Sequence, residues 1–67
     1  MPSVDGDTIR SLREARGWTR MELATRAGVG YWTVVKYEQG RSQKPEYNTL
    51  RRIADALVVT TDDLLTR

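Results

Sequence analysis

Four glycines, at positions 17, 28, 30 and 40, divide the first forty residues of this chain into short segments. Residues 8–16, 18–27 and 31–39 hold no proline and no glycine, so nothing interrupts a helix inside these segments. Glycine ends helices readily because it adopts the left-handed backbone conformation without a steric penalty. The spacing therefore predicts three short helices, over about residues 8–16, 20–27 and 31–39.

The helix starts carry capping signals. Asp7 precedes the first segment as a candidate cap, and Thr19 with Glu22 forms a Thr-x-x-Glu capping box at the start of the second. The second and third helices are separated only by residues 28–30, a joint with two glycines. Two short helices joined by a tight glycine-bearing turn, here over about residues 20–39, are typical of the helix-turn-helix motif.

The second half of the chain predicts two more helices. Residues 40–45 lack apolar side chains and are predicted to form a loop, after which Leu50, Ile53 and Leu57 indicate an amphipathic helix over about 47–57. A Thr60–Asp63 cap before two leucines predicts a short fifth helix. With no strand-like alternation and no internal repeat, we expect an all-α, compact five-helix domain over residues 1–67, with an ordered core at about 7–66.

Composition excludes several function classes. The 67 residues have room for one small domain, and the chain contains no cysteine and no histidine. Disulfides, Cys/His zinc sites, thiol nucleophiles and imidazole bases are therefore excluded. We expect a protein that is not an enzyme and that binds no cofactor and no metal. No apolar run reaches membrane-spanning length, and the N-terminus does not resemble a signal peptide, which predicts a cytoplasmic protein without membrane contact.

Positive charge is concentrated in the middle of the sequence. Residues 10–52 hold ten Lys and Arg against four Asp and Glu, a net +6, whereas the flanks sum to −4. A basic segment beside acidic ends is typical of a protein with one face for a polyanion, because cationic contacts to phosphates release counterions. An ordinary solvated surface is the alternative interpretation.

Several motifs in order resemble one known family. They are residues 9–19 (IRSLREARGWT), 22–24 (ELA), 27–29 (AGV), 38–41 (EQGR), 50–57 (LRRIADAL) and 62–65 (DDLL). In this order and spacing they resemble the helix-turn-helix repressors of the lambdoid phage repressor and Cro type, also called the Xre family. The resemblance implies five helices, a third helix that enters the major groove of double-stranded DNA, and a homodimer on a two-fold symmetric operator.

The helical wheel of residues 31–39 separates two faces. At 100° per residue, Val34 and Tyr37 lie on one arc, where they would pack against the small residues Ala24 and Gly28 of the preceding helix. The opposite arc would face the bases. The predicted base-reading residues are Tyr31, Trp32, Val35 and Lys36. Lysine donates to guanine, and apolar side chains pack on thymine methyl groups.

Phosphate contacts are expected around that helix, from helix starts and from the following loop. The predicted phosphate-binding residues are Thr19, Arg20, Thr33, Arg41, Ser42, Gln43 and Lys44. The resemblance also implies a structural ion pair between Arg13 and Glu38. For dimerisation, which the family suggests, the predicted surface is the joint after the fourth helix: Val58, Val59, Thr61 and Leu65.

The sequence departs from the family pattern at four places. Arg20 replaces a usual glutamine, and Gly30 stands where Ser or Thr usually caps the third helix. Val58 replaces the glycine that commonly ends the fourth helix, which predicts a strained turn or exposed methyl groups. Tyr31 and Trp32 occupy positions that are generally polar.

Two functions therefore compete. The first is a sequence-specific DNA-binding transcriptional regulator, most simply a repressor, regulated by its concentration or by a regulatory protein partner. The second is a protein-interaction module of antitoxin or anti-repressor type that docks a partner through Tyr31, Trp32 and Val35, because Trp and Tyr are also preferred anchors of protein interfaces.

Overall fold

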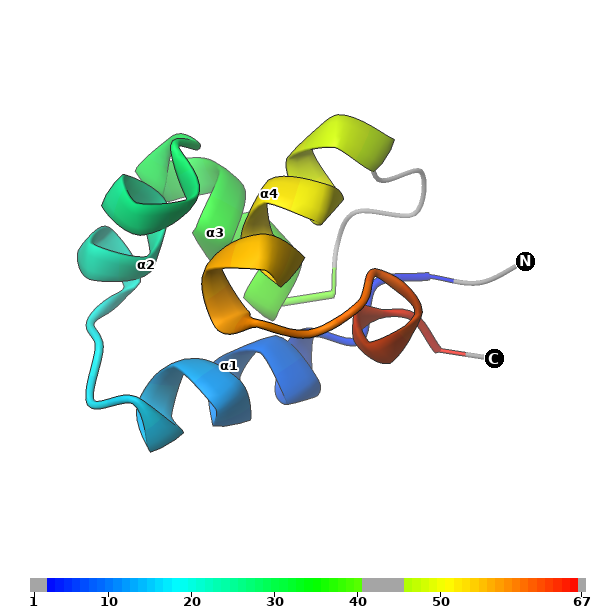
Figure 1. Cartoon of the computed structure of the whole chain (residues 1–67), viewed down its shortest axis with the longest axis horizontal. Coiled ribbons are helices and arrows are strands. Elements are labelled where there is room, and N and C mark those ends of the chain that lie inside the picture. Colours follow the sequence, from blue (N-terminus) through cyan, green and yellow to red (C-terminus); the bar gives the residue numbers. More distant parts are fainter. Residues whose placement is uncertain (1–2, 41–45, 67) are drawn as a thin grey trace.

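A computed structural model describes residues 3–40 and 46–66 and places four α-helices in them (Figure 1). The helices are α1 (Gly6–Ala15), α2 (Arg20–Ala27), α3 (Tyr31–Glu38) and α4 (Tyr47–Leu57), followed by a 3-10 turn, η1 (Asp62–Leu64). The described residues form no β-strand beyond one isolated bridge. The all-α class is confirmed, and α2, α3 and α4 begin and end within one residue of the predicted bounds.

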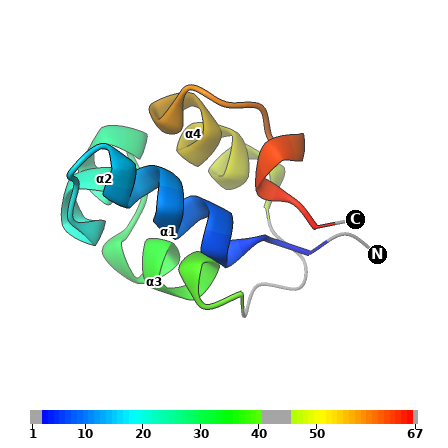
Figure 2. The same ribbon diagram turned by 90° about the horizontal axis from the view of Figure 1, so that it is seen from below.

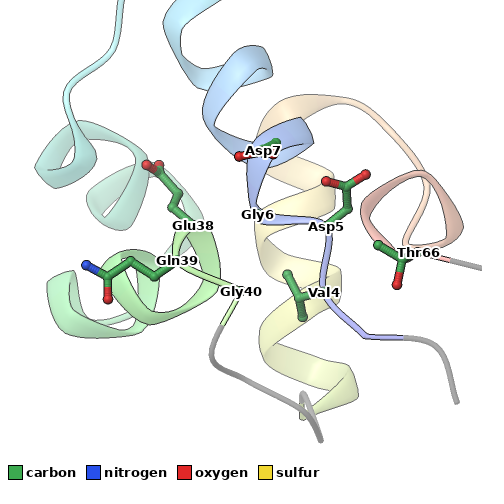
Figure 3. Close-up of a pocket in the computed structure, with 8 residues that line it drawn as sticks. All are labelled: Val4, Asp5, Gly6, Asp7, Glu38, Gln39, Gly40 and Thr66. Carbon is green, nitrogen blue, oxygen red and sulfur yellow. The ribbon is translucent and has the colours of Figure 1, made fainter.

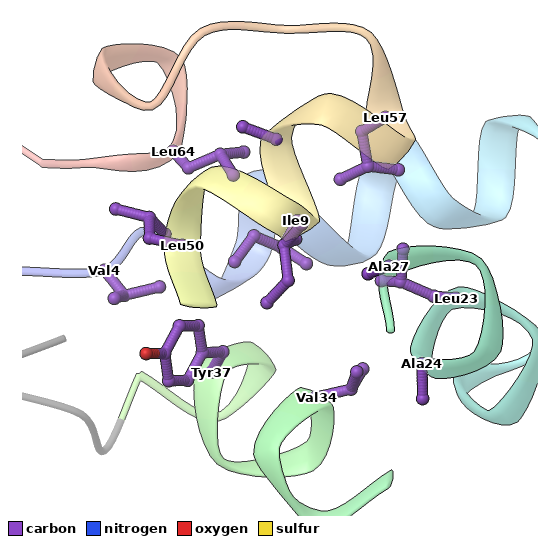
Figure 4. Close-up of a cluster of buried hydrophobic side chains, with 12 residues drawn as sticks. Val4, Ile9, Leu23, Ala24, Ala27, Val34, Tyr37, Leu50, Leu57 and Leu64 are labelled. Atoms are coloured by element: carbon purple, nitrogen blue, oxygen red, sulfur yellow. The ribbon is translucent and has the colours of Figure 1, made fainter. Parts of the chain in front are cut away.

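The helices surround one apolar core. In Figures 1 and 2, α2 and α3 lie together at one end of the molecule, and α2 also packs against α4 while α1 packs against α3. Figure 4 shows buried side chains from all four helices, from η1 and from the N-terminal segment converging on this core. The cluster consists of Val4, Ile9, Leu23, Ala24, Ala27, Val34, Tyr37, Leu50, Ile53, Ala54, Leu57 and Leu64.

The apolar core includes a residue that lies before the predicted ordered range. Val4 precedes the range expected for the ordered core, yet only 3% of it is exposed. It forms an antiparallel bridge with Leu65, and Asp5 N donates to Leu64 O at 2.8 Å. A single valine ahead of the first helix has no periodic pattern around it, so nothing local in the sequence indicates its burial.

The predicted count of five helices is not confirmed, because the last segment forms only the single 3-10 turn η1. The expected cap is present, because Asp63 N donates to Thr60 Oγ1 at 3.3 Å and Thr60 N donates to Asp63 Oδ2 at 3.1 Å. Leu65 then adopts an extended backbone, with φ −113° and ψ 140°. Its bridge to Val4 requires that conformation, which ends the helical turn after three residues.

The first helix begins two residues earlier than predicted, and its cap is Asp5, not Asp7. Asp5 Oδ1 accepts from Thr8 N at 3.2 Å, while Asp7 lies in the first turn and pairs with Arg10. Gly6, the first helical residue, lies against the end of α3 (Figure 3). A Cβ atom there would lie 2.6 Å from Tyr37 O, so this close approach of backbones requires glycine.

The fourth helix ends on a strained residue. Val58 has φ 59° and ψ 46°, and among the described residues it is the one non-glycine with a positive φ. A β-branched side chain is unfavourable in this left-handed conformation. The strained turn and the exposed methyl groups predicted from the missing glycine are both present, since Val58 is 79% exposed.

Candidate nucleic-acid interface

Local signals set the geometry of the α2–turn–α3 unit. Thr19 Oγ1 accepts from Glu22 N at 3.1 Å, and Glu22 Oε1 accepts from Thr19 N at 2.9 Å, which completes the predicted capping box. Gly28 ends α2 in the left-handed conformation, and Val29 N donates back to Ala24 O at 3.0 Å. The turn thereby directs α3 across α2, with Val34 buried between them.

Two side chains dominate the outer face of α3. Trp32 is 74% exposed, and Lys36, one turn later, is also exposed. Tyr31 is half-buried, and its ring meets the Trp32 ring edge to face, with centroids 5.2 Å apart and planes at 79°. The start of α3 therefore presents an apolar ring held by a neighbour, with a cation beside it.

Val35 does not belong to this outer face, which corrects its predicted role in base reading. It is only 6% exposed, although the helical wheel placed it near Tyr31. Because α3 packs against α2 on one side and α1 on another, its covered arc includes Val35 as well as Val34. The wheel predicts the direction of each side chain, but not how much of the helix its neighbours cover.

A buried carboxylate links three elements behind this face. The Glu38 side chain is 1% exposed, and its Oε2 lies 2.6 Å from Arg13 Nε. Arg13 also donates from one amino group to Glu38 Oε1 at 3.1 Å and from the other to Trp18 O at 2.7 Å. The structure thus joins the two residues that the family resemblance paired, and it ties α1 to the end of α3.

The same carboxylate also holds Arg20, a contact that the sequence did not predict. Arg20 Nε lies 3.1 Å from Glu38 Oε1, and the Arg20 side chain is 37% exposed. The hydrogen bond to Glu38 is the main cause that raises the pKa of Arg20, and Tyr31 adds a smaller contribution. Arg20 and Glu38 are 18 positions apart on different helices, so no helical spacing could indicate their contact.

The other predicted phosphate-binding residues are placed as follows. Thr19 is exposed at the start of α2, where its hydroxyl oxygen accepts from Glu22 N, so its hydroxyl hydrogen remains free to donate outward. Thr33 is half-buried on α3. The loop residues Arg41, Ser42, Gln43 and Lys44 lie outside the described residues.

The four predicted dimer residues differ in exposure. Val58 is exposed, whereas Val59, Thr61 and Leu65 are half-buried. Val59 and Leu65 pack against the core of their own chain, and Leu65 is engaged by Val4. Within this set, Val58 therefore carries the largest free apolar surface.

Two further arginines hold helix ends, and sequence reasoning missed both. Arg16 donates to Leu57 O at the end of α4, and Arg52 donates to Gly28 O at the end of α2, at 3.3 Å. The Arg16 and Arg26 guanidinium groups also lie 5.6 Å and 4.6 Å from the centroid of the Trp18 ring. Cations near helix C-termini are favourable because the carbonyl groups there carry partial negative charge.

The structure also limits other kinds of site. Within residues 3–40 and 46–66, no cluster of three acidic residues is placed to hold a metal ion. None of the helices in the described part of the chain has the length and apolar character needed to cross a membrane.

Comparison with known proteins gives a consistent picture. Residues 6–67 match the model of a family described as helix-turn-helix domain. The chain is 33% identical over 60 residues to the HTH-type transcriptional repressor RghR of Bacillus subtilis, a match that covers 90% of this chain and 44% of RghR. The chain spans less than half the length of the relatives it matches.

Two solved structures have the same fold at 27% sequence identity. The biofilm master regulator SinR, found in Bacillus subtilis and solved in complex with DNA, superposes with a TM-score of 0.80 over 88% of this chain and 94% of that chain. The restriction-modification controller protein C.AhdI of Aeromonas hydrophila superposes with a TM-score of 0.78 over 88% of each chain. The curated relatives of the chain are named as HTH-type transcriptional regulators.

Proposed function

We propose that this chain, which belongs to the helix-turn-helix domain family of the Xre type, binds double-stranded DNA and acts in transcriptional regulation. Residues 1–67 would form one DNA-binding domain, with the helix-turn-helix at about residues 20–39. The observation that carries the proposal is the outer face of α3, where Trp32 and Lys36 are exposed on the helix that follows the turn.

In this proposal α3 enters the major groove and its outer face reads base edges. Lys36 would donate to guanine O6 or N7, and Trp32 and Tyr31 would supply apolar contacts. Val35 is left out of the base-reading set because it is buried. The excess of ten cationic over four acidic residues in positions 10–52 supplies the attraction to the phosphate backbone.

Phosphate contacts are assigned to both ends of the helix-turn-helix. Thr19 caps α2 and Arg20 is its first residue, at a helix start, where backbone amide groups favour anions. Glu38 engages Arg20 through Nε, which leaves the two Arg20 amino groups for a phosphate. Thr33 and the loop residues Arg41, Ser42, Gln43 and Lys44 complete the set on the basis of the family resemblance.

We further propose that the protein represses transcription as a homodimer on a two-fold symmetric operator. The similarity to a protein named as a repressor supports the proposed repression. In the proposed homodimer, exposed Val58 would form the dimer surface together with Val59, Thr61 and Leu65. The rival protein-docking surface loses one of its three anchors, because Val35 is covered within its own chain.

Selection from a random duplex pool tests the proposal. We expect enrichment of a two-fold symmetric site whose half-site centres lie about one helical turn apart. On that site, Lys36→Gln should weaken binding and relax base preference, while Arg10→Gln should have little effect. Both changes remove one positive charge, but Arg10 lies on α1 and pairs with Asp7. Failure to enrich any sequence, with equal weak binding by both variants, would overturn the proposal.

A further inference from the structure

The start of α3 carries much apolar surface for a helix proposed to lie in a groove lined by polar base edges. Trp32 is 74% exposed, and the neighbouring outward side chain with a strong donor is Lys36. We propose that Trp32 recognises the C5-methyl group of a pyrimidine, in thymine or in 5-methylcytosine. This inference rests on the proposed DNA binding and adds the chemical group that the site distinguishes.

The chemistry of the major groove leads to this assignment. Base edges there present hydrogen-bond donors and acceptors, and the C5-methyl group is the largest apolar group among them. An indole ring placed over a polar edge would remove water from it and return at most one hydrogen bond, from Nε1. Over a methyl group, the apolar surfaces of both the ring and the methyl group are buried, which is favourable.

The ring is also held in place, as a specificity determinant requires. Tyr31 contacts it edge to face, with ring centroids 5.2 Å apart, and Tyr31 is itself half-buried. The Tyr31 ring therefore limits the orientations open to the Trp32 ring.

Lys36 is a second proposed base-contacting residue, one helical turn from Trp32. Four residues along an α-helix advance about 6 Å and return to nearly the same side. Successive base pairs are about 3.4 Å apart, so Trp32 and Lys36 would contact base pairs within roughly two steps of each other. We therefore expect a methylated pyrimidine within about two base pairs of a guanine that Lys36 contacts.

A direct consequence is sensitivity to cytosine methylation. Cytosine lacks the C5-methyl group and 5-methylcytosine carries it in the position that thymine does. Where a site has cytosine at the Trp32 position, enzymatic methylation of that cytosine would create the contact. Binding to such sites would then increase with methylation, which would make DNA modification a regulatory input to this domain.

The test uses the duplex recovered by selection and replaces each thymine in turn with deoxyuridine, which removes only the methyl group. At one position per half-site we expect affinity to fall by about fourfold, the magnitude typical of one buried methyl-sized group. At the same position, cytosine and 5-methylcytosine are then compared. Tighter binding to thymine than to uracil would show that the thymine methyl group is recognised. Tighter binding to 5-methylcytosine than to cytosine would show the same for methylated cytosine.

Two variants decide whether Trp32 is the reader. Trp32→Ala should bind thymine and uracil duplexes equally, whereas Lys36→Gln should bind more weakly but keep the thymine preference. Because Trp32 is exposed, thermal unfolding of Trp32→Ala should match the wild type and exclude misfolding. Equal affinity for thymine and uracil at every position, or a preference that survives in Trp32→Ala, would overturn the inference. Absence of any DNA binding by the wild type would instead overturn the proposed function.

Discussion

Arg13 Nε lies 2.6 Å from Glu38 Oε2, and this buried ion pair joins the first helix to the end of the third. Both oxygens of Glu38 are engaged, one of them by Arg13 and Arg20 together. The carboxylate thus fixes α3 relative to α1 and orients the start of α2. The helix proposed to contact DNA is positioned by a charged contact in addition to apolar packing.

Glu38→Gln should therefore lower the free energy of unfolding strongly, by about 3 kcal/mol, because it leaves buried Arg13 without its counter-charge. Urea denaturation would measure the change. Asp7→Asn is the matched control, since it breaks the exposed Asp7–Arg10 pair at 3.2 Å and should change stability by less than about 1 kcal/mol. Equal effects of the two variants would contradict the structural role of Glu38.

Val58→Gly should stabilise the monomer. Glycine accepts the φ of 59° found there without strain, and the gain should be about 1 kcal/mol after the greater flexibility of unfolded glycine is offset. Val59→Gly is the control, because Val59 packs against the core and its loss should destabilise. The same Val58→Gly variant should weaken self-association, measured by analytical ultracentrifugation, if Val58 lies in the proposed dimer surface.

Gly6→Ala should destabilise the fold by several kcal/mol. The added Cβ would collide with backbone atoms at the end of α3, among them Tyr37 O at 2.6 Å, and backbone cannot move aside as a side chain can. Gly30→Ala provides the comparison, because a Cβ there meets only Thr33 Oγ1 at 3.6 Å. Thermal melts that show similar losses for both variants would argue against the close contact between α1 and α3.

The capping box predicts a pH dependence. Hydrogen bonds from Thr19 lower the pKa of Glu22 below its ordinary 4.5. The pKa of Glu22 is lower in the folded chain than in the unfolded chain. The ionised Glu22 therefore stabilises the fold at pH values above its ordinary pKa, and this stabilisation is lost as the pH falls through the pKa of the folded chain. Thr19→Ala removes the hydroxyl but keeps the backbone N–H that donates to Glu22 Oε1, so it should raise the Glu22 pKa only part of the way toward 4.5, as an NMR titration of the Glu22 carboxyl resonance would reveal.

Glu22→Gln separates capping from charge, since an amide oxygen can still accept the hydrogen bond from Thr19 N. The wild type should be more stable than this variant at neutral pH, and the difference should disappear in acid. A stability difference that stays constant across that range would contradict the assigned role of the carboxylate.

The helices that depend on local signals could be predicted from the amino-acid sequence. The bounds of α2 and α4, the Thr19–Glu22 box and the turn at Gly28 follow from caps, glycines and spacing that act within a few residues. Trp32 and Lys36 were assigned to the outer face of α3 by helical geometry alone, and both are exposed.

Which residues are covered or bonded by neighbouring elements depends on the packing of the whole domain. The burial of Val4 and Val35 depends on segments far away in the sequence, as does the contact of Arg20 with Glu38. The 3-10 turn at Asp62–Leu64 ends because Leu65 pairs with Val4. Helical periodicity specifies the direction of a side chain, whereas its burial and its partners are set by what packs against it, which a local pattern does not contain.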